Sequence, residues 1–278
     1  MARTIPFSVD ITGNFVYSEA LTGARKLFQD GVWSAVKLQE IEDKEIFRIV
    51  EKCKEIGLKC VTDGDYSSSS YIDFFHHLEN ISKQEAEVEN VETEEAKERD
   101  ENSESVVSGK IDFDNHFLST PPVTQHFTYL TGIIGGDMYA KALLPSPTTL
   151  LVELIRPENR HNTNRFYPDM DMLVHDIART YRKVLSEFYN MGCRFLQFSD
   201  YTWSLTGDSD IQKISEAVNI DMLTLAATAA RLNDACLEQK PLDMCVSLQF
   251  DNRWWSAGDK EKLAETLLAS RADAFAFD

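Results

Sequence analysis

Residues 41–65 (IEDKEIFRIVEKCKEIGLKCVTDGD) and residues 176–203 (DIARTYRKVLSEFYNMGCRFLQFSDYTW) follow one plan. Each stretch begins with a helical pattern of apolar residues that stops at a glycine, Gly57 or Gly192. A short apolar run follows directly and ends in acidic and other polar residues. A helix, a glycine turn, a buried strand and acids at the strand's carboxyl end are typical of an α/β barrel, which holds its site at that end. The repeated plan therefore predicts both the fold and the place of a site.

Hydrophobic periodicity extends this plan along the chain as one domain, residues 1–278. Strands are expected at 5–13, 58–62, 105–113, 139–144, 194–198, 242–248 and 272–277, and helices at 18–28, 39–56, 126–134, 168–190, 210–236 and 260–270. Seven parallel strands leave two open edges, which a closed barrel does not have. Three alternatives follow. The sheet stays open, a partner or a second copy covers its edges, or the chain is a shortened version of a longer barrel protein. We favour the last.

The composition excludes several classes of partner. The net charge of −18 disfavours nucleic acid, because its phosphates would be repelled. No apolar run is long enough to cross a membrane and the first residues do not form a signal peptide, so we expect a cytoplasmic protein without membrane contact. Five scattered cysteines without a CxxC pair indicate reduced thiols rather than a disulfide framework.

Part of the negative charge is concentrated in one segment. Residues 83–104 contain ten acids and three basic residues, with few large apolar side chains. Such a segment cannot bury a core, so residues 82–108 are predicted to be a disordered acidic insertion between the second and third strands. An acidic docking arm is the alternative interpretation.

Four polar clusters follow predicted strands. They are Asp63 with Asp65, Pro145-Ser146-Pro147, Ser199 with Asp200 and Trp203, and Asp243-Met244-Cys245. With VTDGDY, GKIDF and above all GCRFLQFSDYTW, they resemble the cobalamin-independent methionine synthase family. The similarity is to short, single-barrel members, which correspond to the catalytic carboxyl-terminal barrel of the full enzyme, and it covers most of the chain outside the insertion. The resemblance implies a TIM-type (βα)8 barrel, here without its last strand and helix.

The resemblance also implies a reaction. In that family zinc holds the thiol of homocysteine as thiolate, which takes the methyl group of a methyltetrahydrofolate in methionine biosynthesis; cobalamin is not used. Such a site needs soft zinc ligands, carboxylates for the substrate ammonium and a proton donor. The partners implied are therefore a small thiol and a methyl-folate, and the cofactor is zinc.

Carried over by position, the resemblance assigns Asp65 to the substrate ammonium, where the family has a glutamate. It assigns Asp200 to the catalytic acidic pair, in which Ser199 replaces the first acid. Its remaining substrate-binding positions are Gly13, Ser146, Gln197 and Trp203. Ser67 and Ser68 replace a pair of arginines, and Asn14 and Tyr17 lie where a Gly-Ser…Arg motif is usual.

The zinc ligands are only partly present. The family's His-x-Cys corresponds to Asp243-Met244-Cys245, so Cys245 and Asp243 are the candidate ligands, and the family's glutamate ligand corresponds to Ala276 or Phe277. Because a catalytic zinc site needs three protein ligands, weak metal binding is expected. Cys245 can also be interpreted as a small buried apolar residue, and we favour that interpretation over zinc ligation.

Three functional hypotheses remain open. The first is a zinc-dependent S-methyltransferase acting through Asp65, Asp200 and Cys245. The second is a non-catalytic or truncated barrel that serves as a binding scaffold. The third is a metal-free relative, since uroporphyrinogen decarboxylase shares the superfamily. Outside these clusters, Asp171 and His175 lie one helical turn apart and could share a metal, but pairing of His175 with a neighbouring carboxylate is the more economical prediction.

Overall fold

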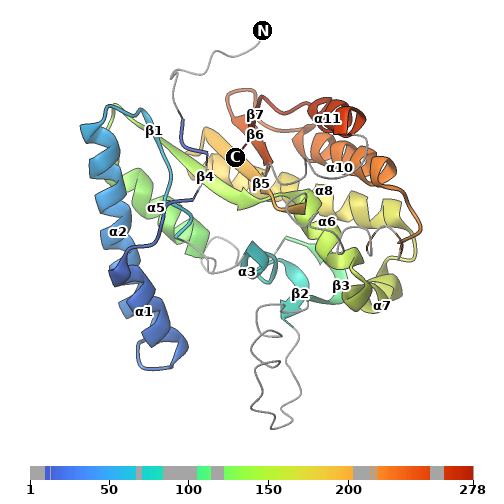
Figure 1. The fold of residues 1–278 in the computed structure, drawn as a ribbon, viewed down its shortest axis with the longest axis horizontal. Helices are drawn as coiled ribbons and strands as arrows, with labels where there is room; N and C mark the ends of the chain where they lie inside the picture. Colours follow the sequence, from blue (N-terminus) through green and yellow to red (C-terminus); the bar gives the residue numbers. More distant parts are fainter. Residues whose placement is uncertain are drawn as a thin grey trace.

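The structure is a computed structural model that describes residues 10–12, 14–66, 71–83, 105–113, 122–202, 214, 216, 218–250 and 260–277. Five parallel strands form a sheet that curls into a half-barrel, with helices packed around it (Figure 1). The strands of this sheet are β1 (Cys60–Val61), β4 (Tyr139–Pro145), β5 (Phe195–Asp200), β6 (Cys245–Phe250) and β7 (Ala274–Phe277). The helices are α1 (Glu19–Gln29), α2 (Ala35–Glu55), α3 (Tyr71–Phe75), α5 (Pro122–Ile133), α6 (Pro147–Ile155), α7 (Pro157–Phe166), α8 (Met170–Asn190), α10 (Met222–Leu237) and α11 (Lys260–Leu268).

The strand order is β1-β4-β5-β6-β7, and every neighbouring pair is parallel. Pro145 pairs with Ser199, and Asp200 pairs with Phe250, so β4, β5 and β6 end at the same edge of the sheet. Parallel strands need a crossover between them, and helices supply most of these crossovers. The predicted α/β fold is confirmed as a curled half-barrel that corresponds to part of a TIM-type barrel.

The two stretches with the shared plan end their helices in the same way. Gly57 after α2 and Gly192 after α8 have φ of 78° and 94°, a left-handed conformation that glycine adopts without strain. In α2 the amide of Leu58 donates to the carbonyl of Cys53, and in α8 the amide of Cys193 donates to the carbonyl of Phe188. This is the Schellman arrangement. Each helix therefore turns directly into the strand that follows it.

Side chains along the strands alternate between two environments. Those on the helix side form the apolar core, in which Phe198 of β5 packs against Tyr181 of α8 with ring centroids 5.5 Å apart. Those on the inner side include a buried polar group: the ammonium of Lys141 binds the Asp10 carboxylate at 2.8 Å, the Gln197 side-chain oxygen at 3.1 Å and the carbonyl of Ile11. A lysine that is 2% exposed is stable only with such partners.

The strand predicted at 105–113 forms but does not belong to the barrel sheet. It is β3 (Ser105–Asp112), and it pairs antiparallel with β2 (Glu79–Lys83), a strand that the sequence analysis did not predict. The predicted insertion 82–108 was thus too wide, because residues 82–83 and 105–108 are paired in this hairpin. Residues 84–104, which hold the acids, lie outside the described residues.

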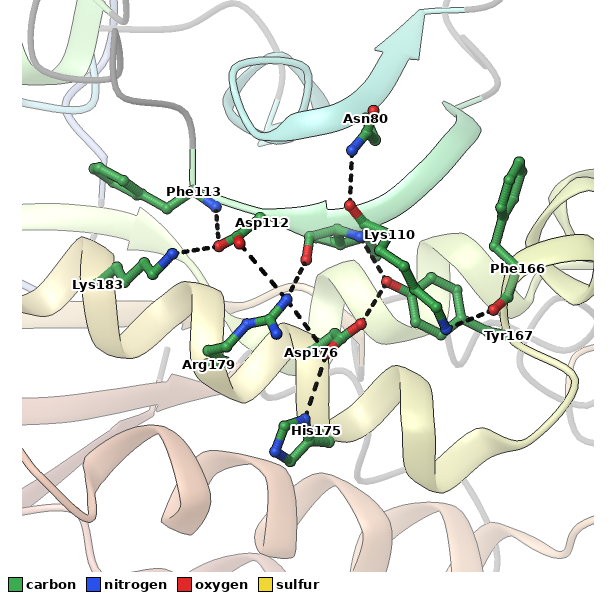
Figure 2. Close-up of polar contacts among 11 residues, drawn as sticks. Asn80, Lys110, Asp112, Phe113, Phe166, Tyr167, His175, Asp176, Arg179 and Lys183 are labelled. Carbon is green, nitrogen blue, oxygen red and sulfur yellow. Dashed lines mark hydrogen bonds and ion pairs between the residues drawn. The ribbon is translucent and has the colours of Figure 1, made fainter.

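A polar cluster fastens the hairpin to α8 (Figure 2). The Asp112 carboxylate accepts a hydrogen bond from Lys183 at 2.6 Å, and Arg179 donates to the carbonyl of Ile111 at 3.1 Å. The Tyr167 hydroxyl accepts from the amide of Ile111 at 2.6 Å and donates to Asp176 at 3.0 Å. These contacts join segments 56 to 71 residues apart in sequence and hold the hairpin against α8.

Most of the other predicted elements are confirmed within a few residues: α1, α2, α5, α8, α11 and β1, β4, β5, β6 and β7 correspond to predicted segments. The helix predicted at 210–236 corresponds to α10, which begins only at Met222. The helices α3, α6 and α7 were not predicted. The first predicted strand, 5–13, lies mostly outside the described residues. No helix of the described segments combines the length and the apolarity that crossing a membrane requires. All five cysteines are free thiols, as predicted.

The hairpin attachment predicts a stability effect. Tyr167→Phe removes the hydroxyl that serves both the buried amide of Ile111 and the carboxylate of Asp176, so we expect the free energy of unfolding to fall by about 1–3 kcal/mol. Urea denaturation followed by circular dichroism measures this change. The matched control is Tyr189→Phe. The Tyr189 hydroxyl binds the more exposed Asp243, so its loss should cost less than about 1 kcal/mol. Equal losses in the two variants would contradict the role of Tyr167.

Candidate functional site

A cavity of about 820 Å³ opens at the carboxyl edge of the sheet. Pro145 of β4, Ser199 of β5 and Tyr201 directly after β5 form its floor, and Asp65 lies at its side in the turn that follows β1. The helices α1, α2, α3 and α5 contribute the rest of the wall. Polar residues after the strands were predicted to lie at one edge of the sheet. This is confirmed for Asp65 and Ser199, which line the same cavity.

The turn at residues 62–66 sets the position of Asp65. Gly64 has φ of 77°, and a side chain at this residue would collide with Ile49, whose Cδ1 lies 2.7 Å from the place of a Cβ. Asp65 itself has φ of 61°, which is uncommon for a residue other than glycine, and its amide donates to Oδ1 of Asp63 at 3.1 Å. Strained backbone of this kind persists where surrounding contacts hold it, and it concentrates at functional sites.

The electrostatic surroundings of Asp65 favour a neutral carboxyl. Burial and the neighbouring carboxylate of Asp63 raise its pKa from 3.8 to about 7, while Arg25 and a hydrogen bond from Asn14 act in the opposite direction. Asp65 is thus close to half ionised at neutral pH. A cationic ligand in this part of the cavity would offset the negative charge of Asp63 and Asp65, because an ammonium beside Asp65 stabilises its ionised form.

A second charged cluster lies behind Asp65 in the same cavity wall. His126 of α5 is 1% exposed, and its Nε2 is 3.1 Å from Oε2 of Glu42 in α2. Its Nδ1 faces Oδ2 of Asp63 at 3.7 Å, an ion-pair separation. Burial opposes a charge on His126, but Asp63 and Glu42 together outweigh it and raise the pKa of His126 to about 9. The imidazolium therefore stays charged at neutral pH.

Two predicted site residues point away from the cavity. Asp200 follows Ser199, so strand alternation directs its side chain toward the helix layer, where its Oδ1 accepts from the amide of Thr202 at 3.1 Å. Ser146 is fully buried, and its hydroxyl caps α6 by accepting from the amide of Thr149 at 3.0 Å. Neither residue lies among those that line the cavity, and both support its floor from behind.

Gln197 lies on the inner side of the sheet, below the cavity. Its side-chain nitrogen donates to the carbonyl of Thr12 at 2.9 Å and to Oε1 of Gln249 at 2.8 Å, and its oxygen accepts from Lys141. All the polar atoms of its side chain are thus used inside the half-barrel. These bonds join β5, β6 and residues 10–12, and the predicted substrate contact of Gln197 stays a prediction.

Cys245 and Asp243 lie at the opposite end of β6 from the cavity. Cys245 is the first residue of this strand and pairs with Phe195, whereas Asp200 pairs with Phe250 at the strand's other end. Five residues of parallel strand separate the two levels by about 16 Å. Burial raises the pKa of the Cys245 thiol to about 11, which disfavours the thiolate, and Asp243 binds Arg194 at 3.0 Å. The expectation that Cys245 and Asp243 join Asp200 in one site is corrected accordingly.

The donor set required for zinc is incomplete within the described segments. No three histidine, cysteine, aspartate or glutamate side chains gather there in a metal-binding arrangement. Gln249, on the inner side near the carboxyl end of β6, is bonded to Gln197, and Ala276 pairs with it in the next strand. These residues do not fit a three-ligand zinc site.

Several predicted residues lie outside the described part of the chain: Gly13, Trp203, Ser67 and Ser68. Away from the cavity, Asp171 and His175 each contact a different charged side chain. Asp171 binds Arg231 at 2.6 Å, and Nδ1 of His175 lies 3.3 Å from Oδ1 of Asp176, so the prediction that His175 pairs with a neighbouring carboxylate is confirmed (Figure 2).

Three charged residues of the site were not identified from the sequence: Arg25, Glu42 and His126. Glu42 carried a detectable signal, because it lies four residues before Ile46 and seven before Ile49, on the buried face of α2. An acid on an apolar helical face is buried only with a partner. The partner is His126, which lies 84 residues away in sequence, so its identity could not be inferred from spacing.

The chain was compared with known proteins. No protein-family model matches it. It is 30% identical to the uncharacterized protein YxjH of Bacillus subtilis (strain 168) over 272 residues, which cover 96% of this chain and 68% of YxjH. It is also 30% identical to the uncharacterized protein YxjG of the same organism, over 94% of this chain and 67% of YxjG. The chain thus spans about two thirds of both relatives.

The solved structures that are similar to the chain include two methionine synthase relatives. One is a Listeria monocytogenes protein provisionally named a vitamin-B12-independent methionine synthase, with a TM-score of 0.72 and 28% identity over 98% of this chain and 73% of that protein. The other is a B12-independent methionine synthase from Shewanella sp. W3-18-1 in complex with selenomethionine. It has a TM-score of 0.54 and 14% identity over 88% of this chain and 65% of that protein, so it supports the fold alone. The fold, the cavity at its carboxyl edge and these similarities place the chain in the family of cobalamin-independent methionine synthases.

Proposed function

We propose that this chain binds an amino-acid thiol of the homocysteine class in the cavity and transfers a methyl group to its sulfur from a methyl-folate. The observation that carries the proposal is the position of Asp65, a carboxylate held in a strained turn at the cavity wall. Family resemblance assigns this position to the substrate ammonium. A methyl transfer of this kind forms an S–CH₃ bond and breaks the bond from the methyl carbon to N5 of the folate; the thiol loses a proton and N5 gains one.

The described residues bind and orient the amino-acid part of the substrate. The carboxylate of Asp65 accepts hydrogen bonds from the ammonium, and the ion pair is strengthened by partial burial. Asn14 and the Tyr201 hydroxyl, next to Asp65 in the cavity, offer further hydrogen bonds. Ser199 on the floor adds a hydroxyl. The ammonium is thereby fixed relative to the edge of the sheet, and the thiol end extends into the cavity.

The zinc that family resemblance implies does not fit the described residues, because Cys245 and Asp243 lie at the other end of β6. No step of the proposed reaction is therefore derived through a metal. This incomplete donor set favours a second candidate function, in which the chain binds the amino acid but does not turn it over. The two candidates share the binding step and differ in whether methionine is formed.

The first prediction from this proposal concerns ligand affinity and pH. L-Methionine, the thioether product, should bind through its ammonium to ionised Asp65, so its affinity should rise about tenfold from pH 6 to pH 8 as a carboxyl with a pKa of about 7 ionises. Isothermal titration calorimetry measures the affinity. Asp65→Asn should weaken binding at pH 8 at least about tenfold and abolish the pH dependence. The control Asp137→Asn lies in an exposed turn and should bind as the wild type does. Retained pH dependence in Asp65→Asn would refute the assignment.

The second prediction concerns stability. The pKa of Asp65 is raised from 3.8 to about 7 in the folded state, so the folded protein binds this proton more tightly than the unfolded chain does. The stability that this proton contributes is therefore lost as pH rises from about 4 to about 7. Relative to the wild type, Asp65→Asn should change the melting temperature little at pH 4 and raise it by about 10 °C at pH 8. Differential scanning calorimetry of both proteins at both pH values tests this, and a variant less stable than the wild type at pH 8 would contradict it.

The third prediction separates the two candidate functions. Zinc content, measured by mass spectrometry of the purified chain, should be the same in the wild type and in Cys245→Ala, because Cys245 lies far from the cavity.

Formation of methionine from L-homocysteine and methyltetrahydrofolate, with and without added zinc, then tests turnover. Methionine formation that Asp65→Asn abolishes supports methyl transfer, whereas L-methionine binding without turnover supports the binding function. Stoichiometric zinc that disappears in Cys245→Ala would overturn the placement of the site.

A further inference from the structure

His126 is the one described residue that joins the outer helices to the turn carrying Asp65 by charged contacts on both sides of its ring. On the helix side, its Nε2 lies 3.1 Å from Oε2 of Glu42. On the strand side, its Nδ1 lies 3.7 Å from Oδ2 of Asp63. The other oxygen of Asp63, Oδ1, accepts the amide hydrogen of Asp65 at 3.1 Å. Four residues from three separate segments therefore form a continuous chain of polar contacts that ends at the cavity.

We propose that His126 is a positioning residue, which acts through Asp63 to hold the Asp65 carboxylate in the orientation that binds the substrate ammonium. This inference rests on the proposed function of Asp65. It assigns to His126 a role that requires no contact with the substrate, although the ring itself borders the cavity.

The first argument is mechanical. Asp65 has φ of 61°, a conformation that costs a non-glycine residue free energy and that must be held by its surroundings. The hydrogen bond from its amide to Asp63 is the contact that holds it. That bond requires one orientation of the Asp63 carboxylate, and the imidazolium of His126 favours this orientation by attracting the opposite oxygen. The remaining side-chain contact of His126, to Glu42, fixes the ring.

The second argument is electrostatic. Asp63 and Asp65 are two carboxylates only two residues apart, and their repulsion opposes ionisation of Asp65. A positive charge on the far side of Asp63 reduces this repulsion. The other charged groups facing the cluster are Arg25, which lies 3.7 Å from Glu42 and itself lowers the pKa of Asp65, and Asp43, whose carboxyl is influenced by both His126 and Glu42. Within the described cluster, His126 is the cation in direct ion-pair range of Asp63.

The arrangement of the cluster keeps His126 positively charged over the pH range in which Asp65 titrates. The two carboxylates raise the pKa of His126 to about 9, whereas the pKa of Asp65 is about 7. His126 consequently remains cationic while Asp65 gains or loses its proton. Nδ1 of His126 has no hydrogen-bond partner, so it acts on Asp63 through charge and can follow small movements of that side chain.

The test measures the ionisation of Asp65 directly, without a ligand. Carbon-13 NMR titration of the aspartate carboxyls, with the Asp65 signal assigned by its loss in Asp65→Asn, should give a midpoint near pH 7 in the wild type. In His126→Gln, which removes the positive charge but retains a polar side chain, the midpoint should rise by about one pH unit. The matched control is His77→Gln. His77 also borders the cavity, but burial lowers its pKa, so its replacement removes no charge at neutral pH and should leave the midpoint unchanged.

A merely structural role for His126 would lower the melting temperature without moving the midpoint of Asp65, and that result would overturn the proposal. If His126→Gln does not fold, Glu42→Gln provides the same test. Loss of the Glu42 carboxylate should lower the pKa of His126 from about 9, visible in the NMR signals of its ring, and should shift the Asp65 midpoint upward. An unmoved Asp65 midpoint in folded Glu42→Gln, with the His126 pKa lowered to 7 or below, would also overturn the proposal.

Binding of L-methionine separates this inference from the proposed function. At pH 7 an upward shift of one unit reduces the ionised fraction of Asp65 about fivefold, and the affinity of His126→Gln should fall by the same factor. If the wild type does not bind L-methionine, the proposed function fails, while the NMR titration still decides whether His126 controls Asp65. If the wild type binds and His126→Gln binds equally well at pH 7, the positioning role is refuted.

Discussion

Parallel pairing of the strands is the constraint on which the rest of this molecule depends. Because β4, β5 and β6 run in the same direction and in matched register, their carboxyl ends meet at one edge, and the residues after them can line one cavity. The same constraint excludes residues at the amino ends. Cys245 belongs to the same strand as Gln249, but it is separated from the cavity by the length of β6. Which end of a strand a side chain occupies therefore decides its function more strongly than its chemical type does.

Alternation of side chains along each strand decides which residues at the carboxyl edge face the cavity. Ser199 and Tyr201 face the cavity, whereas Asp200 between them faces the helix layer and is bonded to Thr202. The inner side below the cavity is closed by Lys141, Gln197 and their partners. This buried polar group requires all of its hydrogen bonds, because an unpaired ammonium in the half-barrel would be strongly destabilising. The floor of the cavity is consequently a fixed structure, while its charged wall comes from helices and turns.

The part of the cavity wall that carries Asp65 lowers the stability of the folded protein. Asp65 lies in a left-handed turn, next to Asp63, in surroundings that favour its neutral form. The turn conformation and the neighbouring Asp63 carboxylate each oppose an ionised Asp65 in the folded protein, and in the proposed function a bound ammonium offsets the repulsion between the two carboxylates. The Glu42–His126–Asp63 cluster stabilises this turn, whereas the contacts of Asp112 and Tyr167 fasten the hairpin to α8. Part of the buried charge of the described residues, on Glu42, Asp63 and His126, thus lies beside the turn that family resemblance assigns to the substrate.

The sequence by itself determined the fold class and most of the elements, because hydrophobic periodicity and the glycine caps after α2 and α8 are local properties. It also placed Asp65 and Ser199 at the edge where the cavity lies. Only the tertiary structure decided that Asp200 and Ser146 point away, that Cys245 lies at the far end of β6, that residues 105–113 leave the barrel sheet, and that His126 joins Glu42 to Asp63. Register and long-range pairing set these positions, and both depend on contacts between residues distant in sequence, which local patterns do not specify.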